Sequence, residues 1–161
     1  MTDRLVIIGG GQAAFACAAK LRALADMRPI TIISGEAAYP YQRPPLSKKY
    51  LLGEMTLDRL MFRPAEWYAE NAVEILTGIR ATSIDGAAKT VSLSTGETLS
   101  YGKLAFATGS TPRNLPQSLT GGLAGIFTIR SFADADHLRP HMQAGQRLLV
   151  VGGGYIGLEA A

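Results

Sequence analysis

The sequence predicts an α/β protein with a parallel central sheet. Two stretches lead to this prediction: Leu5–Ala14, an apolar run that enters a glycine-rich turn and continues into helix-compatible residues, and Leu148–Ala161, which repeats the pattern. Between them, the β-branched run Ile30–Ser34 follows the first predicted helix and completes a βαβ unit. Strands that alternate with helices in this way form parallel sheets.

The first glycine turn fits the G-x-G-x-x-G/A fingerprint of Rossmann-like, dinucleotide-binding folds through Gly9, Gly11 and Ala14. Gly9 permits the sharp turn, Gly11 lets the backbone approach a pyrophosphate, and Ala14 lets the helix pack closely on the strand. The N–H groups at the start of the helix would then face the phosphates. Such a turn also occurs without a ligand, but the second copy in Leu148–Ala161 favours dinucleotide binding.

Composition and charge describe an ordinary α/β protein. The 161 residues are 47% hydrophobic and 18% charged, enough for one domain with a sizeable core. A net charge of +3 without a Lys/Arg run argues against nucleic acid as a partner. No apolar run reaches membrane-spanning length, and the single cysteine, Cys17, cannot form an internal disulfide, so we expect no membrane partner and a cytoplasmic protein.

A helix is expected from Gln12 to about Ala25, where the residues are alanine-rich, and Pro29 ends the pattern. After the second strand, Glu36 lies 22 positions beyond Ala14, the distance at which an acidic residue binds the adenosine ribose in such units. A solvated loop carboxylate is the alternative interpretation of Glu36.

Prolines hold the segment Ala38–Gly53 extended before a helix that is expected over Leu46–Leu52, with Ser47 as its cap. Arg43 and Lys48 flank this rigid turn. Two cations held there can pair with a phosphate or a polarised ring atom of a bound dinucleotide, and two surface cations are the alternative.

The two glycine fingerprints together with YQRPPLSKKYLLG (residues 41–53) resemble the oxygenase-coupled ferredoxin reductases of the rubredoxin and putidaredoxin reductase type. The resemblance implies a glutathione-reductase-like fold of three layers (ββα) with a small antiparallel β insertion. It also implies hydride transfer from NAD(P)H to FAD, followed by single-electron transfer to a ferredoxin- or rubredoxin-like iron–sulfur protein of an oxygenase or P450 chain. Disulfide-reducing relatives carry C-x-x-x-x-C in this region, and its absence here excludes dithiol chemistry.

The middle of the chain is expected to form one short helix and several short strands. Pro64–Asn71 is the helix, and turn residues separate the runs Val73–Leu76, Arg80–Asp85 and Thr90–Leu93. The resemblance makes these runs the three-stranded insertion and the returning strand of the FAD domain, and it places the backbone of Ala81 against the adenine.

A strand that ends in a glycine turn is expected at Lys103–Arg113. This segment resembles the ATG motif of these flavoproteins, so Ala107, Thr108 and Gly109 are expected near the cofactor. A further strand is expected at Ile126–Ile129. The residue that follows it, Arg130, corresponds to an arginine that contacts the flavin nucleotide in the family.

The capping pair Ser131 and Asp134 predicts a helix that ends near Gly145. His137 and His141 on this helix have the spacing of metal ligands, but no third ligand is evident, so we expect a solvated helix face and no metal. Gln146–Val151 is then expected as the first strand of the second dinucleotide site.

The resemblance pairs Glu159 with Lys48 beside the flavin, as a buried ion pair that acts in catalysis. The lysine would stabilise negative charge on the flavin, and the carboxylate would keep the lysine protonated and oriented. Tyr155 would control access to the nicotinamide. The residues assigned to FAD are Gly9, Gly11, Gln12, Ala13, Ala14, Glu36, Arg43, Lys48, Ala81, Ala107, Thr108, Gly109 and Arg130. The residues assigned to NAD(P)H are Gly152, Gly154, Tyr155, Ile156, Gly157 and Glu159.

We expect residues 1–113 to form the N-terminal part of an FAD-binding domain, and residues 114–161 to form a crossover and the first strand, turn and helix of an incomplete NAD(P)-binding domain. The chain is therefore expected to be a fragment, in which Leu148–Val151 exposes an apolar face. Four matters stay open: NADH against NADPH, the electron acceptor, monomer against homodimer, and which of Ser34, Gly35 and Glu36 holds the ribose.

Three alternative functions also stay open. The same flavin chemistry could serve another acceptor, of the monodehydroascorbate or nitrite reductase type. A non-catalytic FAD-binding redox module is a second alternative, but it would need none of Lys48, Tyr155 and Glu159. A nicotinamide dehydrogenase that binds NAD at the first site is a third, and it gives no role to RPPLSK or ATG.

Overall fold

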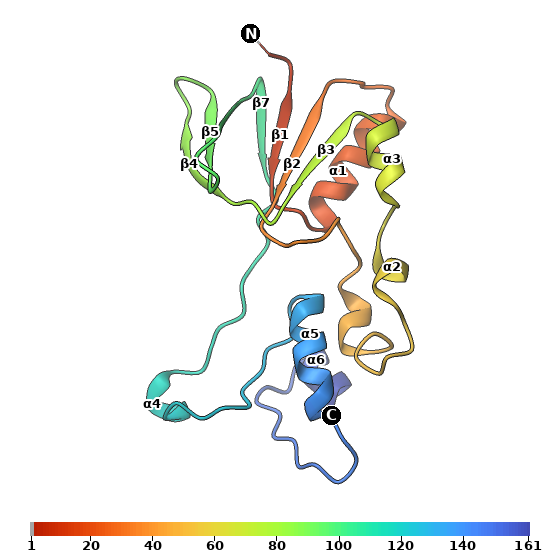
Figure 1. The fold of residues 1–161 in the computed structure, drawn as a ribbon, viewed down its shortest axis with the longest axis vertical. Coiled ribbons are helices and arrows are strands. Elements are labelled where there is room, and N and C mark those ends of the chain that lie inside the picture. The colour runs from red at the N-terminus through yellow and green to blue at the C-terminus, as the bar shows by residue number, and fades with distance from the viewer. Residues whose placement is uncertain (1) are drawn as a thin grey trace. The chain divides into compact units, whose positions relative to one another are not determined.

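The computed structural model describes residues 2–161. The chain forms two compact units, and each takes residues from two separate stretches. The first contains Met1–Tyr41 and Met61–Gly109, and the second contains Gln42–Leu60 and Ser110–Ala161. Figure 1 shows the sheets in the first unit and short helices in the second. The division at residue 113 into an FAD-binding and an NAD(P)-binding part stays a prediction.

A parallel sheet with the strand order β3-β2-β1-β7 forms the centre of the first unit (Figure 1). Its strands are β1 (Leu5–Ile8), β2 (Ile30–Ser34), β3 (Val73–Thr77) and β7 (Lys103–Phe106). Leu5 lies opposite Ile30 in β2 and opposite Lys103 in β7. Because all neighbouring strands are parallel, the residues that follow each strand meet at one carboxyl edge of the sheet.

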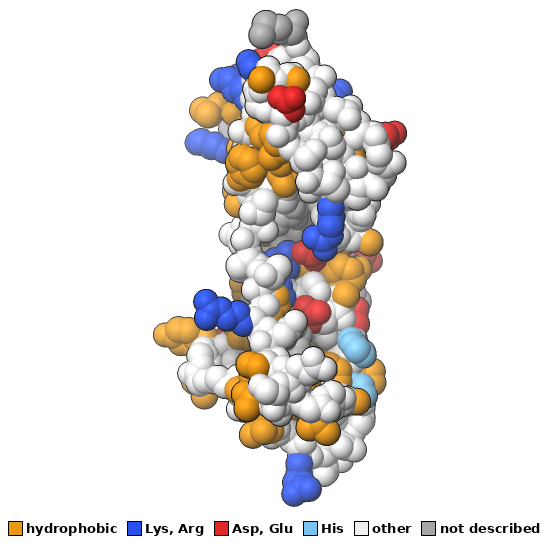
Figure 2. Space-filling model, turned by 90° about the vertical axis from the view of Figure 1, so that its left-hand side faces the viewer, with side chains coloured by type: hydrophobic (Ala, Val, Ile, Leu, Met, Phe, Trp, Pro, Cys, Tyr) orange, Lys and Arg blue, Asp and Glu red, His pale blue; other side chains and the backbone are white. Residues whose placement is uncertain are grey.

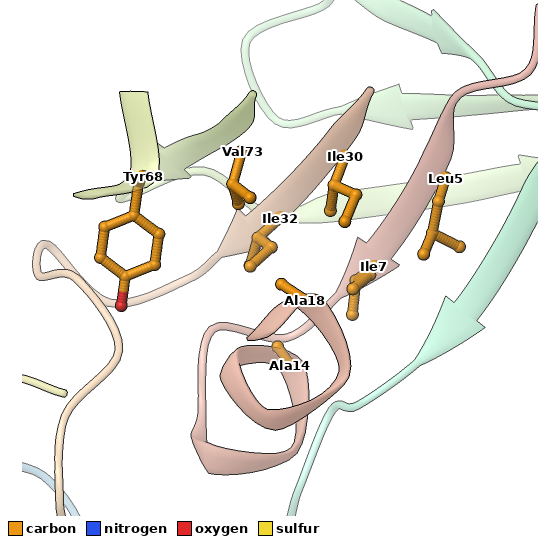
Figure 3. Packing of buried hydrophobic residues seen from close by; sticks show 8 residues of the cluster. All are labelled: Leu5, Ile7, Ala14, Ala18, Ile30, Ile32, Tyr68 and Val73. Atoms are coloured by element: carbon orange, nitrogen blue, oxygen red, sulfur yellow. The ribbon is translucent and has the colours of Figure 1, made fainter. Parts of the chain in front are cut away.

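Helix α1 (Gln12–Ala23) covers one face of this sheet. Figure 3 shows Ala14 and Ala18 directed at the sheet residues Ile7 and Ile32, and all four side chains are fully buried. Alanines on this face let the helix approach the sheet closely. Tyr68, from α3 (Ala65–Glu70), completes the same core with 1% of its surface exposed.

The other face of the sheet packs against a second, antiparallel sheet. Its strands are β4 (Ala81–Asp85), β5 (Thr90–Leu93) and β6 (Thr98–Ser100). Val91 and Leu93 of β5 form a core cluster with Val6 and Ile33, which alternate along their strands with the residues that face α1. This arrangement confirms the three-layer ββα fold with a small antiparallel insertion.

The small antiparallel insertion is made only partly of the expected strands. The predicted run Val73–Leu76 belongs to the parallel sheet, where it lies at the edge as β3 beside β2. The third strand of the insertion is Thr98–Ser100, which pairs with β5. A three-residue strand is too short to show the alternation of apolar and polar residues on which the prediction relied.

The second unit is built from short helices. They are η1 (Pro44–Ser47), α2 (Leu57–Leu60), α4 (Gln117–Thr120), α5 (Phe132–Leu138), η2 (Arg139–His141) and α6 (Tyr155–Ala160). Within the part of this unit that the structure describes there is no β-strand, so the strands predicted at Ile126–Ile129 and Gln146–Val151 are wrong. A strand needs a partner for its backbone hydrogen bonds, and none lies beside these segments among residues 2–161.

Two predicted helices also end differently. In place of a helix over Leu46–Leu52, a 3₁₀ turn ends at Ser47, and backbone hydrogen bonds of separate turns then continue to Gly53. Lys48, with φ −130° and ψ −121°, lies outside the helical region and interrupts the helix there. The helix expected to reach Gly145 ends at Leu138, before a 3₁₀ turn that contains Pro140, because proline has no N–H to continue the helix.

The apolar side chains of the second glycine segment are exposed, as the sequence predicted. Leu148 is 52% exposed, Leu149 86% and Val151 67%. Among residues 2–161, no helix has both the length and the apolar character needed to span a membrane.

Candidate functional site

The first glycine turn leads from β1 into α1 at the carboxyl edge of the parallel sheet. Gly9 has φ +115°, and its N–H donates to the carbonyl of Ile33 over 2.9 Å. A Cβ on Gly9 would lie 2.1 Å from the carbonyl oxygen of Ala107. Both the backbone angle and the contact therefore require glycine, and the turn ties the end of β1 to its neighbours β2 and β7.

The fingerprint does not specify position 10, but this position also requires glycine, because a side chain there would collide with a neighbouring residue. A Cβ at this position would lie 2.3 Å from Oγ of Ser34, a buried residue at the end of β2. At Gly11, in contrast, a Cβ would meet nothing within 4 Å. The turn thus packs tightly against the sheet through Gly9 and Gly10, and it leaves open space at Gly11, the position where the fingerprint expects a phosphate.

The start of α1 has no internal counter-charge. Gly11 is its N-cap, no side chain caps it, and its first turn contains no acidic residue. Gln12 and Ala13 are exposed, and Ala14 is fully buried against the sheet. The first N–H groups of a helix need acceptors and carry partial positive charge, so this end is suited to an anion such as a pyrophosphate.

Glu36 lies just after β2 at the same edge. The hydroxyl of Tyr41 donates to its carboxylate over 2.5 Å, and the backbone N–H of Glu36 lies 3.3 Å from Oγ of Ser34. Ser34 is 1% exposed. Glu36 is therefore held at the end of β2, where an acidic residue binds ribose hydroxyls in βαβ units. Its role as the ribose ligand stays a prediction.

The remaining residues assigned to the nucleotide in the first unit also follow strands at this edge. The N–H of Gly78 donates to the carbonyl of Glu36 and that of Ile79 to the carbonyl of Ser34, both over 3.0 Å, so the chain leading to Ala81 stays close to the end of β2. Beyond β7, Ala107 donates to the carbonyl of Ile8 over 2.8 Å. The two residues that follow, Thr108 and Gly109, are exposed.

In the second unit, Lys48 and Glu159 form the predicted ion pair. Nζ of Lys48 lies 2.7 Å from Oε1 of Glu159, and the hydroxyl of Ser47 donates to Oε2 over 2.6 Å. These two hydrogen bonds, that from Lys48 first, lower the pKa of Glu159 below its ordinary value. The side chains of Lys48 and Glu159 remain 49% and 28% exposed, so the expectation of a buried pair is wrong for this structure.

Ser47 was expected to cap a helix, and its contact with Glu159 was not predicted. The sequence signal was present, because Ser47 immediately precedes Lys48. A hydroxyl donor next to the lysine gives the carboxylate one donor for each oxygen. Both groups are presented by the η1 turn, whose prolines fix the backbone before Ser47.

Arg43 and Arg130 come together in the second unit. Nη1 of Arg43 donates to the carbonyl of Arg130 over 2.5 Å. The carboxylate of Asp134 accepts from the backbone N–H groups of Arg130 and Ser131, over 2.9 and 2.8 Å. Asp134 also donates its own N–H to Oγ of Ser131, which confirms the predicted capping box. These bonds fix the backbone of Arg130 at the start of α5.

The second glycine turn shares the backbone angle of the first. Gly152 has φ +119°, close to the +115° of Gly9, and a Cβ on Gly157 would lie 2.3 Å from the carbonyl oxygen of Gly152. At Gly154 a Cβ would meet nothing within 4 Å. The side chains of Tyr155 and Ile156 are 87% and 55% exposed. The turn thus has the form of the fingerprint, and its role as the NAD(P)H site stays a prediction.

His137 and His141 behave as surface residues. Their rings lie 5.3 and 4.8 Å from the ring of Phe127, and Figure 2 shows histidine side chains at the molecular surface. Among the described residues, no three side chains of His, Cys, Asp and Glu are grouped to hold a metal ion. The pair therefore contributes an aromatic contact to α5 and η2.

Comparison with known proteins identifies the family. Residues 3–161 match the family model described as pyridine nucleotide-disulphide oxidoreductase. The chain belongs to this family. The proteins similar to this chain include a ferredoxin reductase subunit, as the resemblance predicted.

Three similar proteins cover almost the whole chain. The ferredoxin reductase subunit of 5,5'-dehydrodivanillate O-demethylase from Sphingobium sp. is 42% identical over 157 residues, which are 97% of this chain and 38% of that protein. Monodehydroascorbate reductase 5 from Oryza sativa subsp. japonica is 38% identical over 97% of this chain and 34% of its own length. The crystal structure of the covalent putidaredoxin reductase–putidaredoxin complex has a TM-score of 0.90 and 36% identity, over 98% of this chain and 38% of that one.

The chain therefore spans little more than a third of the length of these relatives. The family and the fold follow from the comparisons directly.

Proposed function

We propose that the protein containing this chain is an FAD-dependent NAD(P)H oxidoreductase that supplies single electrons to a small iron–sulfur protein of an oxygenase or P450 system. The observation that carries this proposal is the pair Lys48–Glu159, which is closed by Ser47. A domain that only binds a nucleotide needs anion and ribose contacts, but it needs no lysine held by a carboxylate.

The first unit fits the nucleotide part of FAD. The open space at Gly11 and the uncapped start of α1 suit a pyrophosphate, because a backbone without a Cβ can approach it and free N–H groups can bind it. Glu36 would accept hydrogen bonds from the ribose. The other residues proposed for this part are Gly9, Gln12, Ala13, Ala14, Ala81, Ala107, Thr108 and Gly109.

The second unit would supply the charges for the reactive part. When bound, FAD would take a hydride from NAD(P)H and release the electrons singly, which is the chemistry a one-electron acceptor requires. Lys48 would present a fixed positive charge, and Glu159 would hold Nζ of Lys48 in place. Arg43 and Arg130 would add cationic contacts. Gly152, Gly154, Tyr155, Ile156 and Gly157 are proposed for NAD(P)H.

A second acceptor class deserves a direct test, because monodehydroascorbate reductase 5 from rice is 38% identical to this chain. That enzyme is named for an organic radical acceptor and not for an iron–sulfur protein. The flavin half of the reaction would be the same with either acceptor.

A cytoplasmic location suits the proposed function, since Cys17 is a free thiol.

The experiment compares acceptors with the whole polypeptide reconstituted with FAD. NADH oxidation is followed with a [2Fe–2S] ferredoxin, with rubredoxin and with monodehydroascorbate, and NADPH is tested in parallel. The proposal predicts that kcat/KM with an iron–sulfur acceptor exceeds that with monodehydroascorbate at least tenfold. The reverse preference would assign the protein to the second class, and no turnover with any acceptor would overturn the proposal.

A further inference from the structure

The guanidinium of Arg80 lies on the backbone of Gly35, at the carboxyl edge of the parallel sheet. A Cβ on Gly35 would be 3.2 Å from Cζ, 3.3 Å from Nη1 and 3.4 Å from Cγ of Arg80. Gly35 separates Ser34, the last residue of β2, from Glu36, the predicted ribose ligand. The arginine therefore lies beside the segment that would bind the ribose, and glycine at position 35 makes room for it.

The backbone on both sides of this contact is well fixed. Gly78 and Ile79 donate to the carbonyls of Glu36 and Ser34. The N–H of Arg80 donates to Oγ of Ser94 over 3.1 Å, and its carbonyl accepts from the N–H of Ser94 over 2.8 Å. The position of Arg80 relative to Gly35 therefore follows from hydrogen bonds that are independent of the arginine side chain.

The Arg80 side chain itself has no polar partner. Within residues 2–161, its guanidinium forms no hydrogen bond and no ion pair, and the residue is exposed. Most other arginines of the first unit are engaged: Arg22 donates to several backbone carbonyls, and Arg28 pairs with Asp26. A planar cation held at the sheet edge without a partner is available to a ligand.

The strand order says which part of a dinucleotide would reach it. The pyrophosphate belongs at the start of α1, which follows β1, and the ribose belongs at Glu36, after β2. The next strand in the sheet is β3, and the chain that leaves β3 carries Arg80. A dinucleotide that continues in the same direction along the edge brings its base to Arg80.

We propose that Arg80 stacks its guanidinium on the adenine of the bound dinucleotide and so sets the affinity for its adenosine part. This inference rests on the proposed function, since it takes FAD as the ligand of the first unit. Arginine guanidinium planes stack on nucleobases, and such contacts need no specific hydrogen-bond pattern. Stacking would place the plane of the guanidinium on the base, whereas contact with a phosphate would pair its charge and N–H groups with the pyrophosphate, which remains when the base is removed.

Two substitutions of Arg80, each tested with FAD and with a base-free analogue, distinguish stacking on the adenine from contact with a phosphate. Both are made in the whole polypeptide. Arg80→Ala is expected to weaken FAD binding about tenfold, and Arg80→Lys about as much, because lysine keeps the charge and loses the plane. With an FAD analogue that lacks the adenine base, Arg80→Ala is expected to have no effect. Arg4→Ala is the control, since Arg4 precedes β1 at the opposite edge of the sheet and should leave FAD affinity unchanged.

A third substitution tests the contact without removing the arginine. Gly35→Ala would displace the guanidinium, which is the flexible end of its side chain. It is expected to weaken FAD binding a few-fold in the wild type and not at all in the Arg80→Ala background, so the two changes are non-additive.

Dissociation constants come from fluorescence titration of the apoprotein, and circular dichroism checks that each variant is folded. Equal losses with FAD and with the base-free analogue, or full affinity in Arg80→Lys, would overturn stacking in favour of phosphate contact. Unchanged affinity in Arg80→Ala would overturn the inference and leave the proposed function intact. A wild-type protein that binds no FAD would overturn both.

Discussion

Nζ of Lys48 and Oε1 of Glu159 lie 2.7 Å apart, although the two residues come from the two separate stretches of chain that build the second unit. Ser47 completes the arrangement by donating to the other oxygen of Glu159. The side chains of Lys48 and Glu159 are 49% and 28% exposed, and exposed ion pairs contribute little to stability, so we expect this pair to add little to the stability of the fold.

Replacing Lys48 by Met should slow flavin reduction more than it weakens FAD binding. Removal of one fixed charge from a reacting centre costs about 10²-fold in rate. Anaerobic stopped-flow absorbance measures the reduction step, and a titration measures FAD affinity. Lys49→Met is the matched control, because Lys49 is exposed and, among the described residues, its side chain forms no hydrogen bond or ion pair with Glu159. Equal rates in the Lys48 and Lys49 variants would contradict the assigned role.

The Lys48–Glu159 pair should persist in mildly acidic solution. The hydrogen bonds from Lys48 and Ser47 lower the pKa of Glu159, so the stabilisation from this carboxylate is present above its ordinary pKa and is lost as the pH falls through the lowered value. NMR titration of the Glu159 carboxyl carbon measures that pKa. It should rise in Ser47→Ala and further in Lys48→Met. A wild-type pKa at or above the ordinary glutamate value would show that the pair does not form in solution.

Alanine substitutions in the first glycine turn should show that Gly9 is needed for the stability of the protein and Gly11 for FAD binding. Gly9→Ala is expected to destabilise the protein by more than about 2 kcal/mol, because φ is +115° and the new Cβ would lie 2.1 Å from the Ala107 carbonyl oxygen. Gly11→Ala meets nothing within 4 Å, so stability should be unchanged while FAD affinity falls at least tenfold. Urea unfolding of the apoprotein and FAD titration measure the two effects. Similar stability losses in both variants would contradict this division.

Tyr68→Phe should leave stability unchanged or raise it by about 1 kcal/mol. The Tyr68 hydroxyl is buried without a hydrogen-bond partner among the described residues, and desolvation raises its pKa to about 12. Tyr41→Phe is the comparison, since it removes the donor to Glu36 and should cost about 1 kcal/mol. Thermal unfolding measures both variants. A large loss of stability in Tyr68→Phe would mean that its hydroxyl has a partner in solution.

Sequence patterns were sufficient for β1, α1 and β2 of the first unit because their signals are local. The run Leu5–Ile8, the glycines after it and the alanines of α1 each specify their own conformation, and the strand Ile30–Ser34 is apolar or β-branched almost throughout. The capping box of Ser131 and Asp134 is local as well, and it was predicted correctly.

The errors arose where conformation depends on a partner. Ile126–Ile129 and Gln146–Val151 have strand-like composition, but a strand forms only beside another strand. The contact of Arg80 with Gly35 joins segments far apart in the chain, so no spacing reveals it. The contact of Ser47 with Glu159 could be inferred only from the place of Ser47 beside Lys48, once the Lys48–Glu159 pair was known. The Lys48–Glu159 pair was predicted only because the family resemblance supplied it.

The most direct test of the proposed function is an anaerobic titration of the purified whole polypeptide with NADH, followed by visible absorption. We expect flavin bands that persist through gel filtration, bleach on addition of NADH and return when an oxidised iron–sulfur protein is added. A colourless protein after reconstitution with FAD, or flavin bands that neither NADH nor NADPH bleaches, would contradict the proposed function.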